Sequence, residues 1–219
     1  MLNKTIYIVR HGETVLNLAH IRQGEDGALS ENGRSQAFST GQRLANFNIQ
    51  KMYSSTMPRA METADQILKT INTKIEYTPL LAERRNPTKI IGKSYDDPIT
   101  IEAINFMDKS YHAPDAKWQD EENFSELKDR AIKLRDFLQK NAVDKTLCVT
   151  HGIFLKMFLC VLVYGEKLTI ENYIRLTLFN PADNAGITVV EYSPLHFFSN
   201  PWTIVAYNDG PVDKKSLKI

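Results

Sequence analysis

Short apolar, β-rich segments alternate with helical patterns along most of this chain, and no other feature constrains the fold as strongly. Extended segments are predicted at 5–9, 51–54, 75–81, 146–149, 173–179, 186–192 and 201–206. Helices are predicted at 35–47, 100–111, 124–141 and 153–164, with a further helix that opens near Pro58. Alternation of this kind predicts an α/β protein: a three-layer α/β/α sandwich around a mostly parallel mixed sheet.

The domain organisation is predicted to be simple. A length of 219 residues fits one or two domains, and the chain holds no internal repeat, low-complexity segment or convincing linker. We therefore expect a single domain over 1–219. Residues 84–122 are less regular, with three prolines and many charges, and are interpreted as an insertion that covers the substrate site.

Charge and composition exclude several classes of function. Lysine and arginine exceed the acidic residues by one (27 against 26), so a general nucleic-acid binder has no electrostatic support. No apolar run approaches the length of a membrane span, and the amino-terminal segment does not resemble a signal peptide. Cys148 and Cys160 lie in apolar runs and are expected to be buried, reduced thiols. A cytoplasmic protein is predicted, with its oligomeric state left open.

Two histidines follow predicted strands directly, in Arg10-His11-Gly12 and Thr150-His151-Gly152. Ligands of parallel sheets bind beyond the carboxyl ends of the strands, so we expect these imidazoles to meet although 140 residues separate them. A lone histidine is more often a packing residue. Here an arginine precedes the imidazole and a glycine that lets backbone approach a ligand follows it, which favours an anion site. Neutral imidazole is also a competent nucleophile.

Further motifs join these two. Residues 54–64 read SSTMPRAMETA and include Arg59, while Glu83 follows the third extended segment. Together with RHGETVLN at 10–17 and VTHG at 149–152, they occur in the order that is typical of the histidine phosphatase superfamily. The chain resembles that superfamily over about 6–153, and more narrowly its phosphoglycerate-mutase-like branch.

The resemblance implies a role for each matching residue. His11 would attack phosphorus and become a phosphohistidine, while Arg10, Arg59 and His151 would hold the phosphoryl oxygens. Glu83 would protonate the leaving oxygen and later deprotonate the attacking water. The expected substrate contacts are Asn17, Gln23, Gly24, Arg84, Arg85 and Gly152. No metal or cofactor is expected, because two arginines and a charged histidine could stabilise the transferring group by themselves.

These roles set opposed requirements on the ionisable groups. His11 must be neutral to attack, whereas His151 is expected to be charged, and Glu83 must carry a proton when it acts as an acid. Arg84 and Arg85 would oppose that protonation if they pointed inward. At least one of them is therefore expected to face away, unless the substrate dianion offsets their charge.

A phosphomonoester phosphatase acting on a small phosphorylated substrate is the favoured function, and two alternatives remain. One is a phosphoglycerate mutase, although the residues after Glu83 lack the Tyr-Gly stretch of the glycolytic mutases. The other is a catalytically weak phosphate-binding or adaptor module. Gly92-Lys93-Ser94 does not indicate an ATPase, because Pro87 stands where a phosphate-binding loop needs glycine. A metal hydrolase lacks any motif with metal-ligand spacing.

Overall fold

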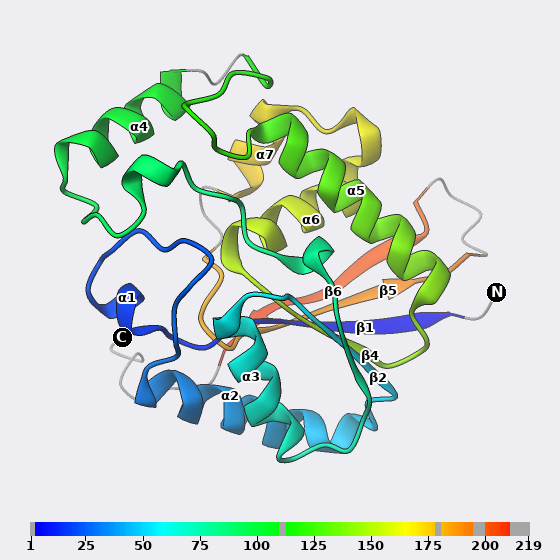
Figure 1. The fold of residues 1–219 in the computed structure, drawn as a ribbon. Helices are drawn as coiled ribbons and strands as arrows, with labels where there is room; N and C mark the ends of the chain where they lie inside the picture. Colours follow the sequence, from blue (N-terminus) through cyan, green and yellow to red (C-terminus); the bar gives the residue numbers. More distant parts are fainter. Residues whose placement is uncertain (1–2, 110–112, 178–180, 195–199, 211–219) are drawn as a thin grey trace, which may run out of the picture.

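The computed structural model describes residues 3–109, 113–177, 181–194 and 200–210. Within these residues, six strands form one mixed sheet with the order β3-β2-β4-β1-β5-β6 (Figure 1). The strands are β1 (Lys4–Arg10), β2 (Lys51–Ser54), β3 (Ile75–Tyr77), β4 (Thr146–Thr150), β5 (Ile187–Tyr192) and β6 (Trp202–Asp209). The predicted fold class is confirmed.

The central strands place both catalytic-candidate histidines at one edge of the sheet. β1 pairs in parallel with β4, and Arg10 lies opposite Thr150 at the carboxyl ends of the two strands. β2 and β3 extend this parallel part, whereas β5 runs antiparallel to β1 and β6 antiparallel to β5. Because β1 and β4 are neighbours that end in register, the residues following them must be close together.

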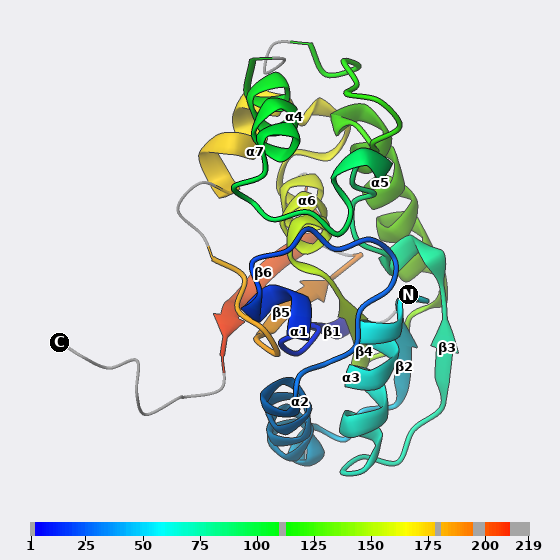
Figure 2. The same cartoon turned by 60° about the vertical axis from the view of Figure 1, so that its left-hand side comes forward.

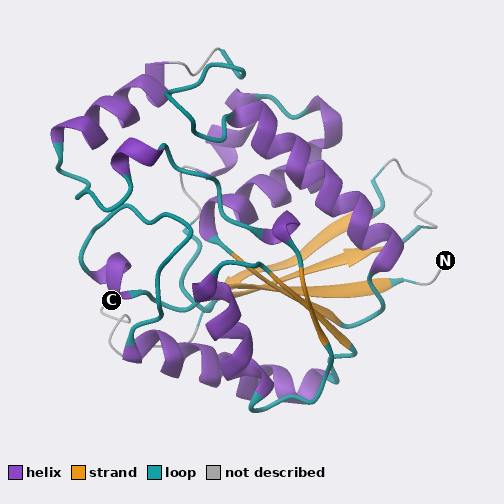
Figure 3. Ribbon diagram, in the orientation of Figure 1, coloured by secondary structure: helices purple, strands orange, loops and turns teal. Residues whose placement is uncertain are grey.

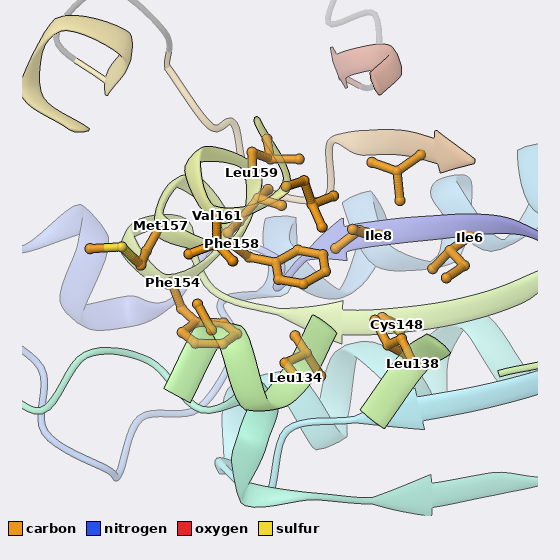
Figure 4. Close-up of a cluster of buried hydrophobic side chains, with 14 of the residues drawn as sticks. Ile6, Ile8, Leu134, Leu138, Cys148, Phe154, Met157, Phe158, Leu159 and Val161 are labelled. Carbon is orange, nitrogen blue, oxygen red and sulfur yellow. The ribbon is translucent and has the colours of Figure 1, made fainter. Parts of the chain in front are cut away.

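Helices cover both faces of the sheet, as the ribbons of Figures 2 and 3 show. On one face α2 (Glu31–Leu44) packs against α3 (Pro58–Leu68), and on the other α5 (Phe124–Asn141) packs against α6 (Gly152–Tyr164). β1 alternates between the two cores: Tyr7 and Val9 face α3, while Ile6 and Ile8 face α6. Figure 4 shows the α6 side, where Phe154 and Phe158 fill the space above the strands.

Local sequence accounts for the ends of these helices. Ser30 caps α2 by accepting a hydrogen bond from the Gly33 amide, so α2 begins four residues before the predicted 35–47 and its last turn, 45–47, is a 3-10 helix. Asn123 and Glu126 form a reciprocal capping box at the start of α5, which has the predicted bounds. Pro58 occupies the first turn of α3. The amphipathic patterns therefore predicted these three helices correctly.

Residues 84–122 form a separate small layer beside the strand ends. It contains the 3-10 helix η3 (Thr88–Ile90) and α4 (Pro98–Lys109), and the latter begins two residues before the predicted helix. Ile90, Ala103 and Trp118 make a small core of their own. The loop that follows the short helix α1 (Val15–Leu18) pairs with this layer, where the Tyr95 amide donates to the His20 carbonyl at 3.1 Å.

Two predicted strands are wrong in part or whole. The segment predicted as a strand over 173–179 forms helix α7 (Ile170–Thr177), and its last two residues lie outside the described chain. Tyr173 and Leu176, three residues apart, pack on the α6 core with helical spacing. The segment 75–81 is extended only as far as Tyr77, after which Pro79 opens the 3-10 helix η2 (Pro79–Leu81).

The two cysteines are buried, as their apolar surroundings in the sequence predict. Cys148 and Cys160 are free and buried, and burial raises the pKa of both thiols to about 12. Along the described part of the chain, no helix combines the length and apolar character needed to cross a bilayer.

Candidate active site

The candidate site lies beyond the carboxyl ends of β1, β2 and β4. The His11 amide donates to the Thr150 carbonyl at 2.8 Å, and the Ser55 amide donates to the Val149 carbonyl at 3.0 Å. A side chain on Gly12 would come within 2.4 Å of the Gly33 carbonyl oxygen. The space beside Gly12 is therefore taken by the backbone of α2. The prediction was that this glycine lets the backbone approach a ligand.

A hydrogen bond to the backbone decides which ring nitrogen of His11 carries the proton. The side chain is only 3% exposed, and its Nδ1 lies 2.7 Å from the carbonyl oxygen of Gly12. A carbonyl oxygen can only accept, so Nδ1 carries the proton. In the neutral imidazole, the lone pair is then on Nε2. This is the tautomer that a nucleophilic histidine requires.

His151 lies behind His11, with 5.0 Å between the two ring centroids. It is fully buried. Arg59 Nε donates to its Nδ1 at 3.1 Å, so that nitrogen has no proton, and Nε2 donates to Ser55 Oγ at 2.8 Å. In this arrangement His151 is neutral. The structure therefore differs from the expectation of a charged His151, because Arg59 donates to the ring nitrogen that would have to carry the second proton.

Electrostatics agree with the hydrogen bonding. Burial is the largest cause that lowers the pKa of both histidines well below 6.5. Arg10 and Arg59 lower the pKa of His11 further, and His11 and Arg59 do the same for His151. Hydrogen bonding to Gly12 offsets part of the effect on His11. This environment lowers the pKa values of both imidazoles and holds both rings in the neutral form, whereas the predicted roles required one neutral and one charged ring.

This pair makes folding sensitive to acid. An unfolded chain takes up protons on these imidazoles as the pH falls below 6.5, while the folded protein resists. Stability is therefore complete above pH 6.5 and is lost below it, by up to about 1.4 kcal/mol per pH unit for each histidine. Urea unfolding between pH 6.5 and about 5.5 should show a smaller decline in the His11→Asn/His151→Asn double variant. Equal declines would contradict the prediction.

Arg59 is 2% exposed, and each nitrogen of its guanidinium has a hydrogen-bond partner. Besides His151, it donates to the backbone carbonyls of Gly24, Glu25 and Asp26 at 3.0–3.4 Å and contacts the Met57 sulfur. Burial lowers the pKa of Arg59, and the Glu83 carboxylate offsets this in part. Arg59 therefore holds both His151 and the loop at 24–26 in place. Gly24, predicted as a substrate contact, contacts Arg59 through its carbonyl.

Arg10 lies against the start of α6. Its guanidinium donates to the Ala182 carbonyl, while its Nε is buried and has no hydrogen-bond partner in the described part of the chain. A side chain on Gly152 would come within 3.2 Å of that Nε, so the glycine after His151 makes room for the arginine. Burial lowers the pKa of Arg10, and Glu83 offsets this as it does for Arg59.

The Glu83 carboxylate is anchored by backbone amides. Its Oε1 accepts from Phe154 and Arg84 at 2.9 Å, and Oε2 accepts from Ile153 at 3.2 Å. Two of these donors belong to the first turn of α6, where the helix dipole favours negative charge. Arg84 contacts this carboxylate through its backbone amide, while its side chain contacts Met107 and Asn86.

A cavity of about 330 Å³ opens at these groups. Its size is within the range of small-molecule sites. It is lined by Arg10, His11, Asn17, Arg22, Gln23, Arg59, Glu83, Asn86, Tyr95, Gly152, Ile153, Lys156 and Ala182. Among these described lining residues, four side chains are cationic and one is a carboxylate, which makes the cavity suited to an anion.

The other residues predicted as substrate contacts divide into two groups. Asn17 accepts from the Thr14 amide through Oδ1, which leaves its Nδ2 as a donor, and Gln23 and Gly152 also line the cavity. Arg84 and Arg85 do not line it. Arg84 contacts Met107 and Asn86, while Arg85 is exposed and donates to the Asp120 carbonyl.

Four polar side chains in the cavity were not predicted. Arg22, Asn86, Tyr95 and Lys156 all line it. Lys156 could have been found, because it lies one turn after Gly152 on the helix that starts at the site. Asn86 and Tyr95 lie in the irregular segment, whose folding no periodicity reveals. Among the described residues, no group of three or more His, Cys, Asp or Glu side chains could hold a metal ion.

Ser55 is a residue whose role only the structure shows. Its hydroxyl accepts from His151 Nε2, so Ser55→Ala leaves a buried donor unpaired, at about 1–3 kcal/mol. We expect a loss of stability and, because His151 is freed to turn, a lower kcat. Ser54 is equally buried but donates to the Ser55 carbonyl at 3.1 Å and does not contact His151. Ser54→Ala should therefore reduce stability without lowering kcat; identical kinetics for the two variants would contradict the assignment.

Known proteins share both the sequence pattern and the fold. The model of the histidine phosphatase superfamily (branch 1) matches residues 6–209. "Probable phosphoglycerate mutase GpmB" of Citrobacter koseri is 28% identical over 207 residues, which cover 93% of this chain and 92% of that protein.

Solved structures resemble the whole chain. YhfR of Bacillus stearothermophilus is 26% identical with a TM-score of 0.78, covering 95% of this chain and 98% of its own. A mycobacterial glucosyl-3-phosphoglycerate phosphatase, Rv2419c, is 22% identical with a TM-score of 0.76, covering 94% and 99%. The second likeness concerns the fold alone.

Proposed function

The chain belongs to the histidine phosphatase superfamily, and we propose that it is a phosphatase that hydrolyses small phosphomonoesters through a phosphohistidine on His11. One observation carries this proposal. The Nδ1–H of His11 is held by the Gly12 carbonyl, so the lone pair of Nε2 is available beside a cavity rich in cationic side chains. Solved structures with this fold include a protein titled as a phosphatase.

In the first half of the proposed reaction, Nε2 of His11 attacks phosphorus. An N–P bond forms, the bond between phosphorus and the ester oxygen breaks, and Glu83 gives the leaving oxygen a proton. Arg10 and Asn17 both line the cavity, and in this proposal Arg10 and the Nδ2 of Asn17 hold phosphoryl oxygens. Glu83 must gain its proton before this step, and the incoming phosphate dianion favours that uptake.

In the second half, water replaces histidine on phosphorus. Glu83, now a carboxylate, takes a proton from the attacking water, the N–P bond breaks, and inorganic phosphate and free His11 are released. The amides of Ile153 and Phe154 hold the carboxylate for this step. The dianion also favours a proton on His151, so in this proposal its charge arrives with the substrate.

The remaining predictions about the site fit this proposal. Residues 84–122 contribute Asn86 and Tyr95 to the cavity, which supports their role as a segment covering the site of a single domain. Gln23 and Gly24 support the site from the opposite loop, with Gly24 acting through Arg59. Arg84 is placed to act through Asn86, to which it donates at 3.4 Å.

Turnover of para-nitrophenyl phosphate, with and without EDTA, tests the reaction and its independence from metal. We expect hydrolysis that EDTA leaves unchanged, since the cationic side chains lining the cavity supply the charge. Complete loss on chelation, restored by a divalent metal, would contradict metal independence. Failure to hydrolyse any phosphomonoester would favour a phosphate-binding or adaptor role.

A phosphoglycerate mutase is the second candidate, because curated relatives are named as probable members of that class. Incubation with 3-phosphoglycerate separates the two. A phosphatase releases inorganic phosphate, whereas a mutase forms 2-phosphoglycerate and needs a bisphosphate primer. Because Arg84 and Arg85 follow Glu83 here in place of a Tyr-Gly stretch, we expect phosphate release to dominate.

A further inference from the structure

The cavity contains one arginine for which the proposed chemistry has no use. Arg10 and Arg59 adjoin His11, and Lys156 is close enough to Arg10 for the two charges to interact. Arg22 also lines the cavity but belongs to the loop beyond α1. Within the described residues, Arg22 is half-buried, and its guanidinium lies over an aromatic ring and not beside a carboxylate.

The guanidinium of Arg22 is held in place by its surroundings. It lies over the ring of Tyr95, with 4.1 Å between its central carbon and the ring centroid. Its backbone is paired on both sides: the amide donates to the Lys93 carbonyl at 2.8 Å, and its carbonyl accepts from Gly92 at 2.9 Å. Such a preorganised cation can bind an anion with little loss of entropy.

Two buried polar atoms lie on Arg22 and its neighbour Gln23. Arg22 Nε and Gln23 Oε1 are buried, and neither has a hydrogen-bond partner among the described residues. A buried N–H donor without a partner is rare and costly, so Arg22 Nε is suited to an anionic oxygen, whereas Gln23 Oε1 can only accept and would not bind an anion. Arg84 is close enough to lower the pKa of Arg22 further, after burial, and a bound anion would relieve that repulsion.

We propose that Arg22 is a specificity-determining residue that binds a second anionic group of the substrate, a carboxylate or a further phosphate. The scissile phosphate is at His11 and Arg10, and the second group lies toward Tyr95 and the segment 92–95. This inference rests on the proposed phosphatase function for the position of the first phosphate. In this proposal Arg22 contacts the substrate directly, which Arg84 and Arg85 were predicted to do.

Three compounds with the same three-carbon chain provide the test: propyl phosphate, 3-phosphooxypropanoate and 1,3-propanediol bisphosphate. Their Kd values are measured by calorimetry on the His11→Ala protein, which cannot turn them over, so the result does not depend on catalysis. Because a charge-assisted hydrogen bond is involved, we expect the carboxylate or the bisphosphate to bind about 10-fold to 100-fold more tightly than propyl phosphate.

Adding Arg22→Gln should abolish that preference and leave the affinity for propyl phosphate within about threefold. Tyr95→Leu should reduce the preference in part, because Arg22 loses its support. Arg34→Gln, an exposed arginine paired with Glu62, is the matched control and should change nothing. Equal affinity for all three compounds, no binding of any, or an equal loss for all three on Arg22→Gln would overturn the proposal.

Discussion

The His11→Ala variant is expected to lose at least about 10⁴-fold in kcat, because removal of a nucleophile leaves only binding and charge stabilisation. No neighbouring side chain can replace it. His151 is fully buried, its Nδ1 accepts from Arg59 and its Nε2 donates to Ser55. The measurement is steady-state hydrolysis of para-nitrophenyl phosphate, with the folded state of the variant checked by its unfolding curve.

His20→Asn serves as the control for His11→Ala. His20 is exposed and has φ of 51°, a conformation that asparagine tolerates, so this variant should retain full activity. We expect kcat to fall in His11→Ala and to stay unchanged in His20→Asn. Retention of substantial activity by His11→Ala, with the fold intact, would contradict the assignment of the nucleophile.

Glu83→Gln should have the second-largest effect, about 10²-fold to 10⁴-fold in kcat for an alkyl phosphate. Glutamine is nearly isosteric and can keep its oxygen at the Oε1 position, where Phe154 and Arg84 donate, although its amide nitrogen cannot accept from Ile153 as Oε2 does. It cannot give or take the proton that the proposed reaction needs. The loss therefore reports on proton transfer more than on the position of the loop.

The leaving group supplies an internal control for Glu83→Gln. A nitrophenolate leaves without protonation, whereas an alkoxide does not, so the acid step matters only for the alkyl ester. We expect the rate of phosphoenzyme formation to fall much less for para-nitrophenyl phosphate than for propyl phosphate. Equal losses for both substrates in a rapid-quench experiment would show that Glu83 acts in some other way.

The sequence predicted the parts of the fold that periodicity encodes. The amphipathic stripe at 124–141 and the buried strand before His151 were found with nearly their observed bounds. The segment 173–179 was mistaken for a strand because its β-branched and aromatic residues permit either structure, and packing of Tyr173 on the α6 core decides for helix. Tertiary contacts of this kind are not visible in a local pattern.

The candidate site shows a similar division. Motif residues after strands, such as Arg10, His11 and Glu83, were found because the sheet brings strand ends together. Arg22 and Tyr95 were not found as a pair, since 73 residues separate them and the segment that joins them has no period. The neutral state of His151 also required the structure, because it depends on the Arg59 hydrogen bond.

Trapping the phosphoenzyme tests the central claim most directly. The protein is mixed with a ³²P-labelled phosphomonoester and quenched during turnover, and the label on the protein is located by peptide mapping. The account predicts a phosphoryl group that is stable in base, labile in acid, attached to His11 and absent from His11→Ala. Turnover without any labelled protein, or label on a residue other than His11, would contradict it.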